Sequence, residues 1–312
     1  MDFYNNKKVL ITGGAGFIGS HLAEKLAFSG AHIVVLDDLS TGKLENLKHV
    51  LPCIELIKGD ITDQGTCLRA TKDVCTIFHH AALISVPETF KDPERCFDVN
   101  IRGTEKILDA AINNGVKNFV LASSAAVYGN KNDLCIETDK PNPQSPYAHS
   151  KIEGERLCKE YSNVYGMSTV VLRYFNVHGE RQNPDSEYSA VIARFTNMLK
   201  NKKPLTIFGT GRQTRDFIEV SEVVKANMIM GCQPNMEGEV FNIATGNSMN
   251  ILEVVERIKN QLKIQPVGIN FMPARSGDIE HSRADCTKYK KFTKDMKNTF
   301  VLKNNQTNEK SL

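Results

Sequence analysis

A glycine-rich turn at residues 9–22 constrains the fold of this chain more than any other feature. In "VLITGGAGFIGSHL" a β-branched, apolar run precedes the glycines and a helical apolar pattern follows them. Gly14, Gly16 and Gly19 match GxGxxG, and Gly13, Gly16 and Gly19 match the wider GxxGxxG. Such glycines allow a tight turn and a close approach of backbone N–H groups to a pyrophosphate. The segment therefore predicts the first strand–helix unit of a dinucleotide-binding sheet.

Strand and helix patterns continue to alternate through the first half of the chain. Runs that are apolar on both faces predict buried parallel strands at 8–12, 32–36, 54–60, 75–82, 118–124 and 168–175. Helical patterns closed by glycine lie between them at 16–30, 92–115 and 145–166. This order predicts an α/β fold: a Rossmann-like, doubly wound parallel sheet with a smaller α/β substrate-binding cap domain.

The predicted domain division follows the change of pattern after Phe175. Residues 1–175 form the dinucleotide-binding domain, with 216–245 returning to it, and residues 176–215 and 246–312 form the substrate-binding domain. The cap contains helical patterns at 190–201 and 251–262 and strand patterns at 205–209 and 267–272. The stretch from Thr287 onward is rich in Lys and Asn with few apolar residues, so we expect it to be peripheral or mobile.

Charge and composition narrow the class of partner. The chain has 39 Lys and Arg against 36 Asp and Glu, a net charge of +3, which favours neither nucleic acid nor an anionic membrane. No signal peptide pattern or apolar run of about 18 residues is visible, so we expect a cytoplasmic protein. The eight cysteines form no CxxC pair and no His spacing, so no metal site or disulfide framework is expected.

Acidic residues close the second and third strand patterns. Asp37 follows "HIVVL" and is placed to bind the adenosine ribose hydroxyls, where a carboxylate repels a 2′-phosphate and favours NAD over NADP. Asp38 is the alternative ribose partner, or a solvated loop charge. Asp60 and Ile61 could meet the adenine, and they fit a simple strand-end turn equally well.

The segment "SPYAHSK" places a phenol beside an ammonium group. Ser145 can cap a helix and Pro146 suits its first turn, so Tyr147 and Lys151 share one face. A neighbouring cation lowers the pKa of a tyrosine, ordinarily about 10, and such a pair could take a proton from a sugar hydroxyl. The alternative is two exposed side chains on a helix. Strand 118–124 ends in Ser123 and Ser124, at the carboxyl edge where such sheets bind ligands.

With Ser, Tyr and Lys in this order after a dinucleotide loop, the chain resembles the extended short-chain dehydrogenases/reductases of the UDP-glucose 4-epimerase type. The resemblance spans about Lys8 to Asp285. It is carried by "TGGAGFIGSHL", "DDLSTG", "GDITD", "HHAALISVPET", "VNIRGT", "SSAAVYG", "SPYAHSK", "LRYFNVHG", "GTGRQTRDFIEV" and "ARSGDIEHSRAD". It implies tightly bound NAD, a UDP-sugar substrate and a homodimer. The implied reaction oxidises the sugar at C4 to a ketone, which turns in the pocket and is reduced from its other face.

The resemblance also assigns residues. Tyr147 is the catalytic base, Lys151 holds the nicotinamide ribose, and Ser124 binds the sugar 4-hydroxyl. It places a set of residues at the cofactor: Gly13, Gly16, Phe17, Ile18, Gly19, Asp37, Asp38, Ser40, Gly42, Asp60, Ile61, Ala81, Ala82, Asn100, Ser123, Tyr147 and Lys151. It places another set at the UDP-sugar: Ser85, Ser124, Asn176, Phe208, Arg215, Arg275, Asp278 and Ser282. Two arginines suit a diphosphate, although Arg215 could instead form a surface ion pair.

Two positions discriminate within this group. Related 4,6-dehydratases carry Asp and Glu directly after the strand-end hydroxyl residue, and decarboxylases carry Glu there, whereas this chain has Ala125 and Ala126. A methyl group cannot act as an acid or base, so dehydration is disfavoured. At the sugar gate a tyrosine narrows the pocket in some members, and Ser282 is small, which predicts activity on N-acetylated sugars as well, unless Ser282 simply faces solvent.

Two other functions remain as alternatives. One is another NAD-dependent nucleotide-sugar oxidoreductase or dehydratase, and the other is a non-catalytic NAD-sensing module. The second is disfavoured because Ser124, Tyr147 and Lys151 are all present. The chain departs from the family pattern at His178 and Glu180, where tyrosine and proline are commoner, and in lacking tryptophan.

Overall fold

A seven-stranded sheet forms the centre of the computed structural model, which describes residues 2–131, 133–183, 191–274 and 280–296. The strand order is β11-β6-β5-β4-β1-β2-β3, and every neighbouring pair is parallel. The strands are β1 (Lys8–Thr12), β2 (His32–Asp37), β3 (Ile54–Lys58), β4 (Thr76–His79), β5 (Asn118–Ser124), β6 (Ser168–Tyr174) and β11 (Glu239–Ile243). The predicted Rossmann-like parallel sheet is therefore confirmed.

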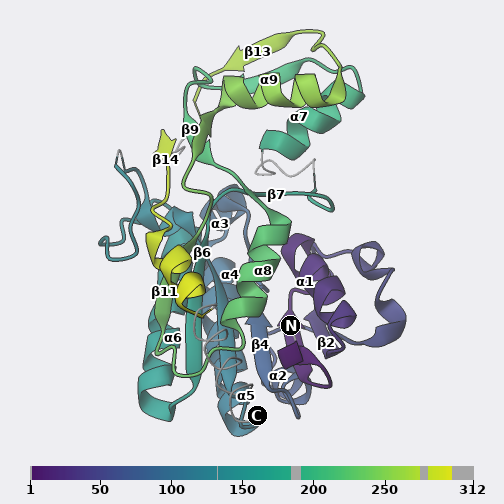
Figure 1. Ribbon diagram of the computed structural model, residues 1–312, viewed down its shortest axis with the longest axis vertical. Helices are drawn as coiled ribbons and strands as arrows, with labels where there is room; N and C mark the ends of the chain where they lie inside the picture. The colour runs from purple at the N-terminus through teal and green to yellow at the C-terminus, as the bar shows by residue number, and fades with distance from the viewer. Residues whose placement is uncertain (1, 132, 184–190, 275–279, 297–312) are drawn as a thin grey trace, which may run out of the picture.

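Helices cover both faces of this sheet (Figure 1). On one face, α1 (Phe17–Phe28) and α8 (Val220–Met230) pack on a buried core that includes the fully buried Tyr4 and Phe78. The second face carries α2 (Gln64–Ala70), α5 (Gly103–Asn113) and α6 (Pro146–Tyr165). Because both faces are covered, the strands are apolar on both sides, which is why the sequence showed continuous apolar runs rather than alternation.

The helical pattern predicted over residues 92–115 corresponds to three consecutive helical elements in the structure. They are α4 (Pro93–Phe97), a π-helical segment η4 (Asp98–Arg102) and α5. The wider turn brings Gly103 against the side chain of Ile61, where an added Cβ would lie 2.7 Å from the Ile61 Cδ1 atom. A 3₁₀ turn, η5 (Ala125–Tyr128), follows β5, and the short helix α3 (Val86–Lys91) precedes α4.

A smaller lobe lies beyond one end of the sheet, at the top of Figure 1. There α7 (Val191–Lys200) and α9 (Ile251–Leu262) share a core with β8 (Leu205–Phe208), which pairs in parallel with β13 (Ile269–Met272). A three-stranded sheet has the order β12-β9-β14, and a pair joins β10 to β7. These strands are β7 (Val177–His178), β9 (Thr214–Asp216), β10 (Ile218–Glu219), β12 (Ser248–Asn250) and β14 (His281–Ser282).

The stretch from Thr287 was expected to be peripheral or mobile, and its described part is a helix at the periphery of the large sheet. Residues 287–296 are helical and pack on the edge of the large sheet. The Phe292 ring lies 5.4 Å from the Phe241 ring on β11, and Lys288 Nζ donates to the Val240 carbonyl at 2.8 Å. Tyr289 and Phe292 pack this helix against the core of the sheet. The average composition of the segment, which is dominated by lysine, does not reveal these two contacts. The rest of that prediction, residues 297–312, lies outside the described residues.

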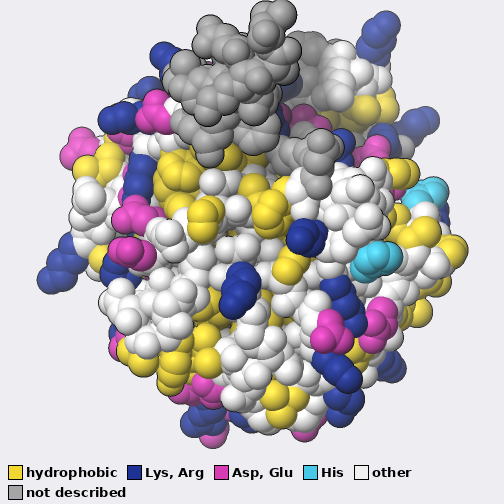
Figure 2. Space-filling view, turned by 60° about the horizontal axis from the view of Figure 1, so that its bottom comes forward, with side chains coloured by type: hydrophobic (Ala, Val, Ile, Leu, Met, Phe, Trp, Pro, Cys, Tyr) yellow, Lys and Arg dark blue, Asp and Glu magenta, His cyan; other side chains and the backbone are white. Residues whose placement is uncertain are grey.

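Charges of both signs are spread over the surface. Lys and Arg side chains lie among Asp and Glu side chains over the face drawn in Figure 2, in line with the small net charge. Across the described ranges, no helix has both the length and the apolar character needed to cross a membrane.

Candidate active site

A broad pocket lies between the carboxyl edge of the large sheet and the smaller lobe. It is lined by most of the residues that the sequence singled out. On the cofactor side these are Gly13, Gly16, Phe17, Ile18, Gly19, Asp37, Asp38, Ser40, Gly42, Asp60, Ile61, Ala81, Ala82, Ser123, Tyr147 and Lys151. On the substrate side they are Ser85, Ser124, Asn176, Phe208, Arg215 and Ser282. Arg275 and Asp278 lie outside the described residues.

The glycine turn forms a close-packed cradle at the start of α1. Gly13 has φ +67°, and an added Cβ there would lie 2.7 Å from the Ala81 nitrogen. At Gly19 a Cβ would lie 2.4 Å from the Gly13 carbonyl oxygen. Gly16 is the N-cap of α1 and has no side chain that could cap the helix, so the first backbone N–H groups stay available to a ligand. The cradle thus fits the pyrophosphate of a dinucleotide.

Asp37 is held in place by the backbone on both sides of its carboxylate. Its two oxygens accept from the Ala15 and Leu39 N–H groups, each at 2.9 Å. Burial raises the pKa of Asp37, while these two hydrogen bonds lower it. Asp38 is exposed and accepts from the Ser40 N–H and hydroxyl. Of the two acidic residues, Asp37 is therefore the one with a fixed carboxylate, and it lines the pocket at the end of β2.

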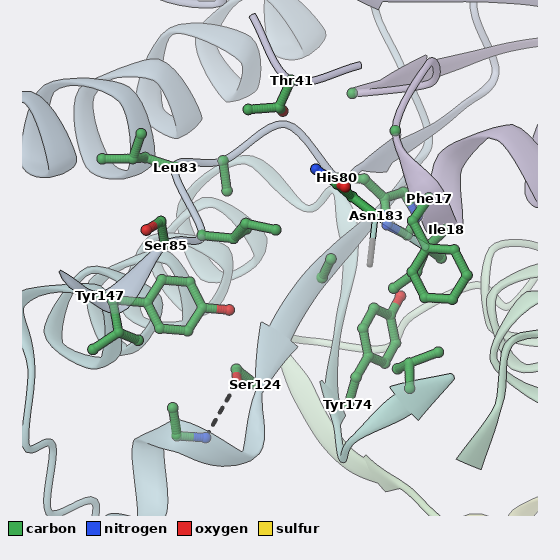
Figure 3. A pocket seen from close by; sticks show the side chains of 18 of the residues that line it. Phe17, Ile18, Thr41, His80, Leu83, Ser85, Ser124, Tyr147, Tyr174 and Asn183 are labelled. Carbon is green, nitrogen blue, oxygen red and sulfur yellow. Dashed lines mark hydrogen bonds between the residues drawn. The ribbon is translucent and has the colours of Figure 1, made fainter. Parts of the chain in front are cut away.

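Helix α6 carries the tyrosine and lysine into the pocket. The Ser145 hydroxyl oxygen accepts from the Ala148 N–H at 3.1 Å, which caps the helix as predicted. Figure 3 shows the Tyr147 phenol directed into the cavity, with Ser85 on the same side and Ser124 below it. Lys151 Nζ lies 5.7 Å from the centre of the Tyr147 ring and donates to the Ala122 carbonyl at 2.8 Å. The shared face is therefore confirmed.

The expected lowering of the tyrosine pKa is not what the structure shows. Burial raises the pKa of Tyr147, and the Ser124 hydroxyl only partly counters it. Burial also lowers the pKa of Lys151 from 10.5 to about 8, with Cys96 and Glu155 acting in the opposite direction. The direction differs because a sequence cannot show how strongly such a pair is desolvated, and the effect of burial on the Tyr147 pKa is larger here than that of the hydrogen bond to Ser124.

The end of β5 is fixed from behind by a buried ion pair. Glu155 on α6 accepts from the Ser123 hydroxyl at 2.5 Å and from Arg173 Nε and Nη2 at 3.0 and 2.7 Å. Glu155 and Arg173 are only 9% and 3% exposed. Beside them the Ser124 hydroxyl oxygen accepts from the Ala126 N–H at 3.2 Å, the dashed line in Figure 3. Strand end and helix are thus locked together at the site.

Asn100 is predicted near the cofactor but does not line the pocket. It is buried, and its amide binds the backbone N–H and carbonyl of Leu83 at 2.7 and 3.0 Å. Its Nδ2 also donates to the Ser150 hydroxyl at 2.9 Å, and that hydroxyl donates to the Tyr147 carbonyl at 2.7 Å. Asn100 therefore connects the wall at Leu83 to the helix turn that carries Tyr147.

On the substrate side, Asn176 and Arg215 lie next to Asp216, a residue that sequence reasoning missed. Asn176 Nδ2 donates to the Asp216 carbonyl at 3.0 Å, and Arg215 precedes Asp216 on β9. The buried Asp216 carboxylate accepts from the Thr245 N–H and hydroxyl, at 2.9 and 2.7 Å. Ser282 on β14 lies opposite Arg215 in the strand register. Thr245, the neighbour that holds the Asp216 carboxylate, lies 29 residues away, so the local sequence of Asp216 carries no signal of this role.

Three more pocket-lining residues, His80, Arg181 and Gln182, were also missed. The neutral form of His80 is favoured, since burial lowers its pKa to about 3, and its ring stacks on Tyr174. Arg181 and Gln182 lie in "NVHGERQ", which marked only a loop. Among the described residues, no group of three or more His, Cys, Asp or Glu side chains could hold a metal ion.

Fold and site together define a dinucleotide-binding enzyme with a Ser-Tyr-Lys constellation. Comparison with known sequences agrees: residues 9–244 match the NAD dependent epimerase/dehydratase family, and the chain belongs to this family. A UDP-glucose 4-epimerase of Mycolicibacterium smegmatis is 38% identical over 286 residues, which cover 90% of each chain.

Solved structures place the chain among epimerases. It superposes with a TM-score of 0.87 on a UDP-N-acetylglucosamine 4-epimerase of Methanobrevibacter ruminantium in complex with UDP-N-acetylmuramic acid, at 37% identity over 92% of this chain and 91% of that one. A UDP-glucose 4-epimerase of Thermotoga maritima with UDP-glucose gives a TM-score of 0.85 at 35% identity, covering 91% of both chains. The predicted family resemblance is confirmed.

Proposed function

We propose that this protein is an NAD-dependent UDP-sugar 4-epimerase. Its substrates are UDP-glucose and UDP-galactose, together with UDP-N-acetylglucosamine and UDP-N-acetylgalactosamine. One observation supports this most strongly: Ser124, Tyr147 and Lys151 border the same pocket as the glycine cradle at one end and Arg215 at the other. A nucleotide sugar and a dinucleotide can therefore meet at the tyrosine.

The residues of the pocket divide the chemistry between them. The glycine cradle and Asp37 would hold NAD, which supplies a reversible acceptor for two electrons at the sugar C4. Tyr147 takes the proton from the sugar O4 and later returns it. Ser124 donates to or accepts from that oxygen and orients it. Lys151 carries a positive charge beside the phenol, and this charge stabilises the phenolate form of Tyr147 that accepts the sugar proton.

Ala125 and Ala126 argue against dehydration and decarboxylation. Both line the pocket directly after Ser124, where the related enzymes carry acidic residues. Their methyl groups can neither protonate a leaving hydroxyl nor take a proton from C5. The chemistry that remains for the site is proton and hydride exchange at one carbon.

The gate position supports N-acetylated substrates. Ser282 borders the pocket, is only 7% exposed and lies beside Arg215 on the neighbouring strand. A serine here leaves room that a tyrosine ring would fill. Since Ser282 is buried at the pocket rather than in solvent, we propose that it admits the N-acetyl group.

A proton NMR time course tests the proposal. Purified protein is incubated with UDP-N-acetylglucosamine, or separately with UDP-glucose, with no added cofactor. Formation of both 4-epimers is expected, and Tyr147→Phe should lose turnover while keeping UDP binding. Conversion of UDP-glucose alone would refute the role of Ser282, and no conversion of either after NAD is supplied would refute the epimerase.

The predicted cytoplasmic homodimer is part of the proposal. Helices α4, α5 and α6 lie on one face of the sheet, and Phe97 and Tyr165 at their ends are 37% and 56% exposed. The family resemblance implies that two chains pair through these helices. Light scattering on the purified protein should give twice the chain mass of 34.8 kDa, and a monomer would refute the assembly.

A further inference from the structure

Three buried side-chain atoms of the described residues have no hydrogen-bond partner: His80 Nε2, Arg181 Nη1 and Gln182 Oε1. All three residues line the pocket. Burying a polar atom without a partner is costly, so such atoms are few in folded proteins and each needs an explanation. Their grouping at one pocket points to a ligand with polar atoms as the missing partner.

The loop that carries Arg181 and Gln182 is fastened to α1. Arg181 Nη2 pairs with the Glu24 carboxylate, and His21 Nε2 bonds the Glu180 carbonyl at 3.0 Å. His21 and Glu24 follow Phe17 by four and seven positions, so all three lie on one face of the helix. Phe17 is the first residue of α1 after the glycine cradle. The loop therefore lies along the helix whose start would bind the pyrophosphate.

Arg181 is held in this position against its backbone preference. Its φ is +63°, in the left-handed region that non-glycine residues seldom occupy. Such strain persists only where surrounding contacts determine the conformation, and it concentrates at ligand sites. The Arg181 side chain is 18% exposed, with Nη2 engaged and Nη1 buried. A guanidinium can hold a carboxylate with one nitrogen and a phosphate with the other.

We propose that Arg181 binds the pyrophosphate of the dinucleotide through Nη1, with Glu24 and His21 holding its loop as a strap over the cofactor. This proposal rests on the proposed function and deepens it. The cofactor is favoured over the nucleotide sugar because the anchors of the loop are on α1, whereas Phe208 and Arg215 are on strands of the smaller lobe. A strap would retain the dinucleotide between the two halves of the reaction.

Release of NAD from the purified protein tests the strap without any sugar. Released NAD is captured by an excess of a second NAD-dependent dehydrogenase and followed by absorbance at the NADH band. Arg181→Met should release NAD about ten to one hundred times faster than the unchanged protein, the range for a hydrogen bond to a charged group. Arg181→Lys keeps a charge and should fall between the two. Arg156→Met, which removes an exposed arginine of α6, should release NAD at the unchanged rate.

A second measurement separates the pyrophosphate from other causes. Calorimetric titration of Arg181→Met should show ADP-ribose weakened by the same factor as NAD, with the affinities for adenosine and UDP changed by less than about twofold. Unchanged NAD release, or a loss of UDP affinity in place of NAD affinity, would overturn the proposal. Protein that retains NAD but epimerises no sugar would refute the proposed function and leave the strap standing.

Where Arg181→Met does not fold, Glu24→Gln tests the same strap. It keeps the guanidinium and removes its anchor, so NAD release should accelerate by a few-fold. A release rate equal to that of Arg156→Met would contradict the strap in this variant too.

Discussion

Loss of the Glu155 carboxylate should be the most damaging single change behind the site. It is 9% exposed and accepts three hydrogen bonds, one from Ser123 and two from Arg173, which is 3% exposed. Burial alone would lower the pKa of Arg173, yet the Glu155 carboxylate raises it above its usual range. In Glu155→Ala the guanidinium therefore stays charged and buried without a counter-ion. Breaking a buried pair in this way costs about 3–5 kcal/mol.

The assay is urea unfolding followed by circular dichroism, with epimerisation measured in parallel. A loss of 3–5 kcal/mol is a large share of a total stability of about 5–15 kcal/mol. The matched control is Arg156→Ala, the next residue of the helix, whose side chain is 51% exposed and pairs with Glu153 and Glu160. Surface pairs contribute about 1 kcal/mol or less, so this control should unfold close to the unchanged protein.

The double variant Glu155→Leu with Arg173→Met isolates the reason for the loss. It removes both charges and keeps apolar volume, so most of the stability lost in Glu155→Ala should return. Activity should not return with it, because Ser123 has lost its acceptor and Lys151 its nearby carboxylate. If Glu155→Ala is no less stable than Arg156→Ala, the buried-charge reasoning is refuted.

Three further perturbations have defined outcomes. Because burial lowers the pKa of Lys151 from 10.5 to about 8, the folded chain binds fewer protons than the unfolded chain between these pH values, and stability rises with pH there. Lys151→Met should thus be more stable than the unchanged protein at pH 7, by up to about 3 kcal/mol, with the gap narrowing from about pH 8 and closing only above pH 10.5; a constant gap in pH-dependent melting would contradict this. Gly19→Ala forces a Cβ to within 2.4 Å of the Gly13 carbonyl, so bound NAD measured after gel filtration should fall sharply, and full occupancy would refute the cradle. Asp216→Ala removes the acceptor of Thr245, and calorimetry should show UDP affinity falling while NAD binding is kept; unchanged UDP affinity would refute the positioning role.

The large sheet could be predicted because each strand and most helices have a recognisable apolar pattern within their own residues. Each predicted strand run corresponds to one observed strand. The strands within 75–82 and 54–60 end earlier than predicted, at His79 and Lys58, where the chain turns into the pocket, and β2 extends one residue further than predicted, to Asp37. The helices α2 and α8 were not recognised. The first has seven residues, too few to show a period, and the second follows the strand pair at β10 without a loop. Local propensity is weak at such lengths.

The site was predictable only where its residues are neighbours in sequence. Tyr147 and Lys151 are one helical turn apart, and the glycines of the cradle lie within seven residues, Gly13 to Gly19, so their spacing carried the signal. Asn100 and Asp216 form hydrogen bonds with residues 17 to 50 positions away, and the sequence around them does not indicate these partners. Arg181 could not be predicted for the same reason, because its partner Glu24 lies 157 residues before it.

Helix α6 explains two outcomes for Tyr147: this residue shares a helix face with Lys151, as predicted, and its pKa is raised rather than lowered. Tyr147, Lys151 and Glu155 follow one another at four-residue steps, so one face of α6 carries a phenol, an ammonium group and a carboxylate. From spacing alone such charges belong in solvent. Arg173 and Ser123 come from two neighbouring strands to meet Glu155, and this allows Glu155 and Lys151 to be buried, at 9% and 7% exposed, while Tyr147 borders the pocket. Burial then sets the pKa values, raising that of Tyr147 and lowering that of Lys151, so each group is brought closer to its neutral form. The raised pKa keeps the proton on Tyr147 before a ligand binds. Positive charge on a bound ligand would lower this pKa again, so we expect catalysis to depend on the bound cofactor.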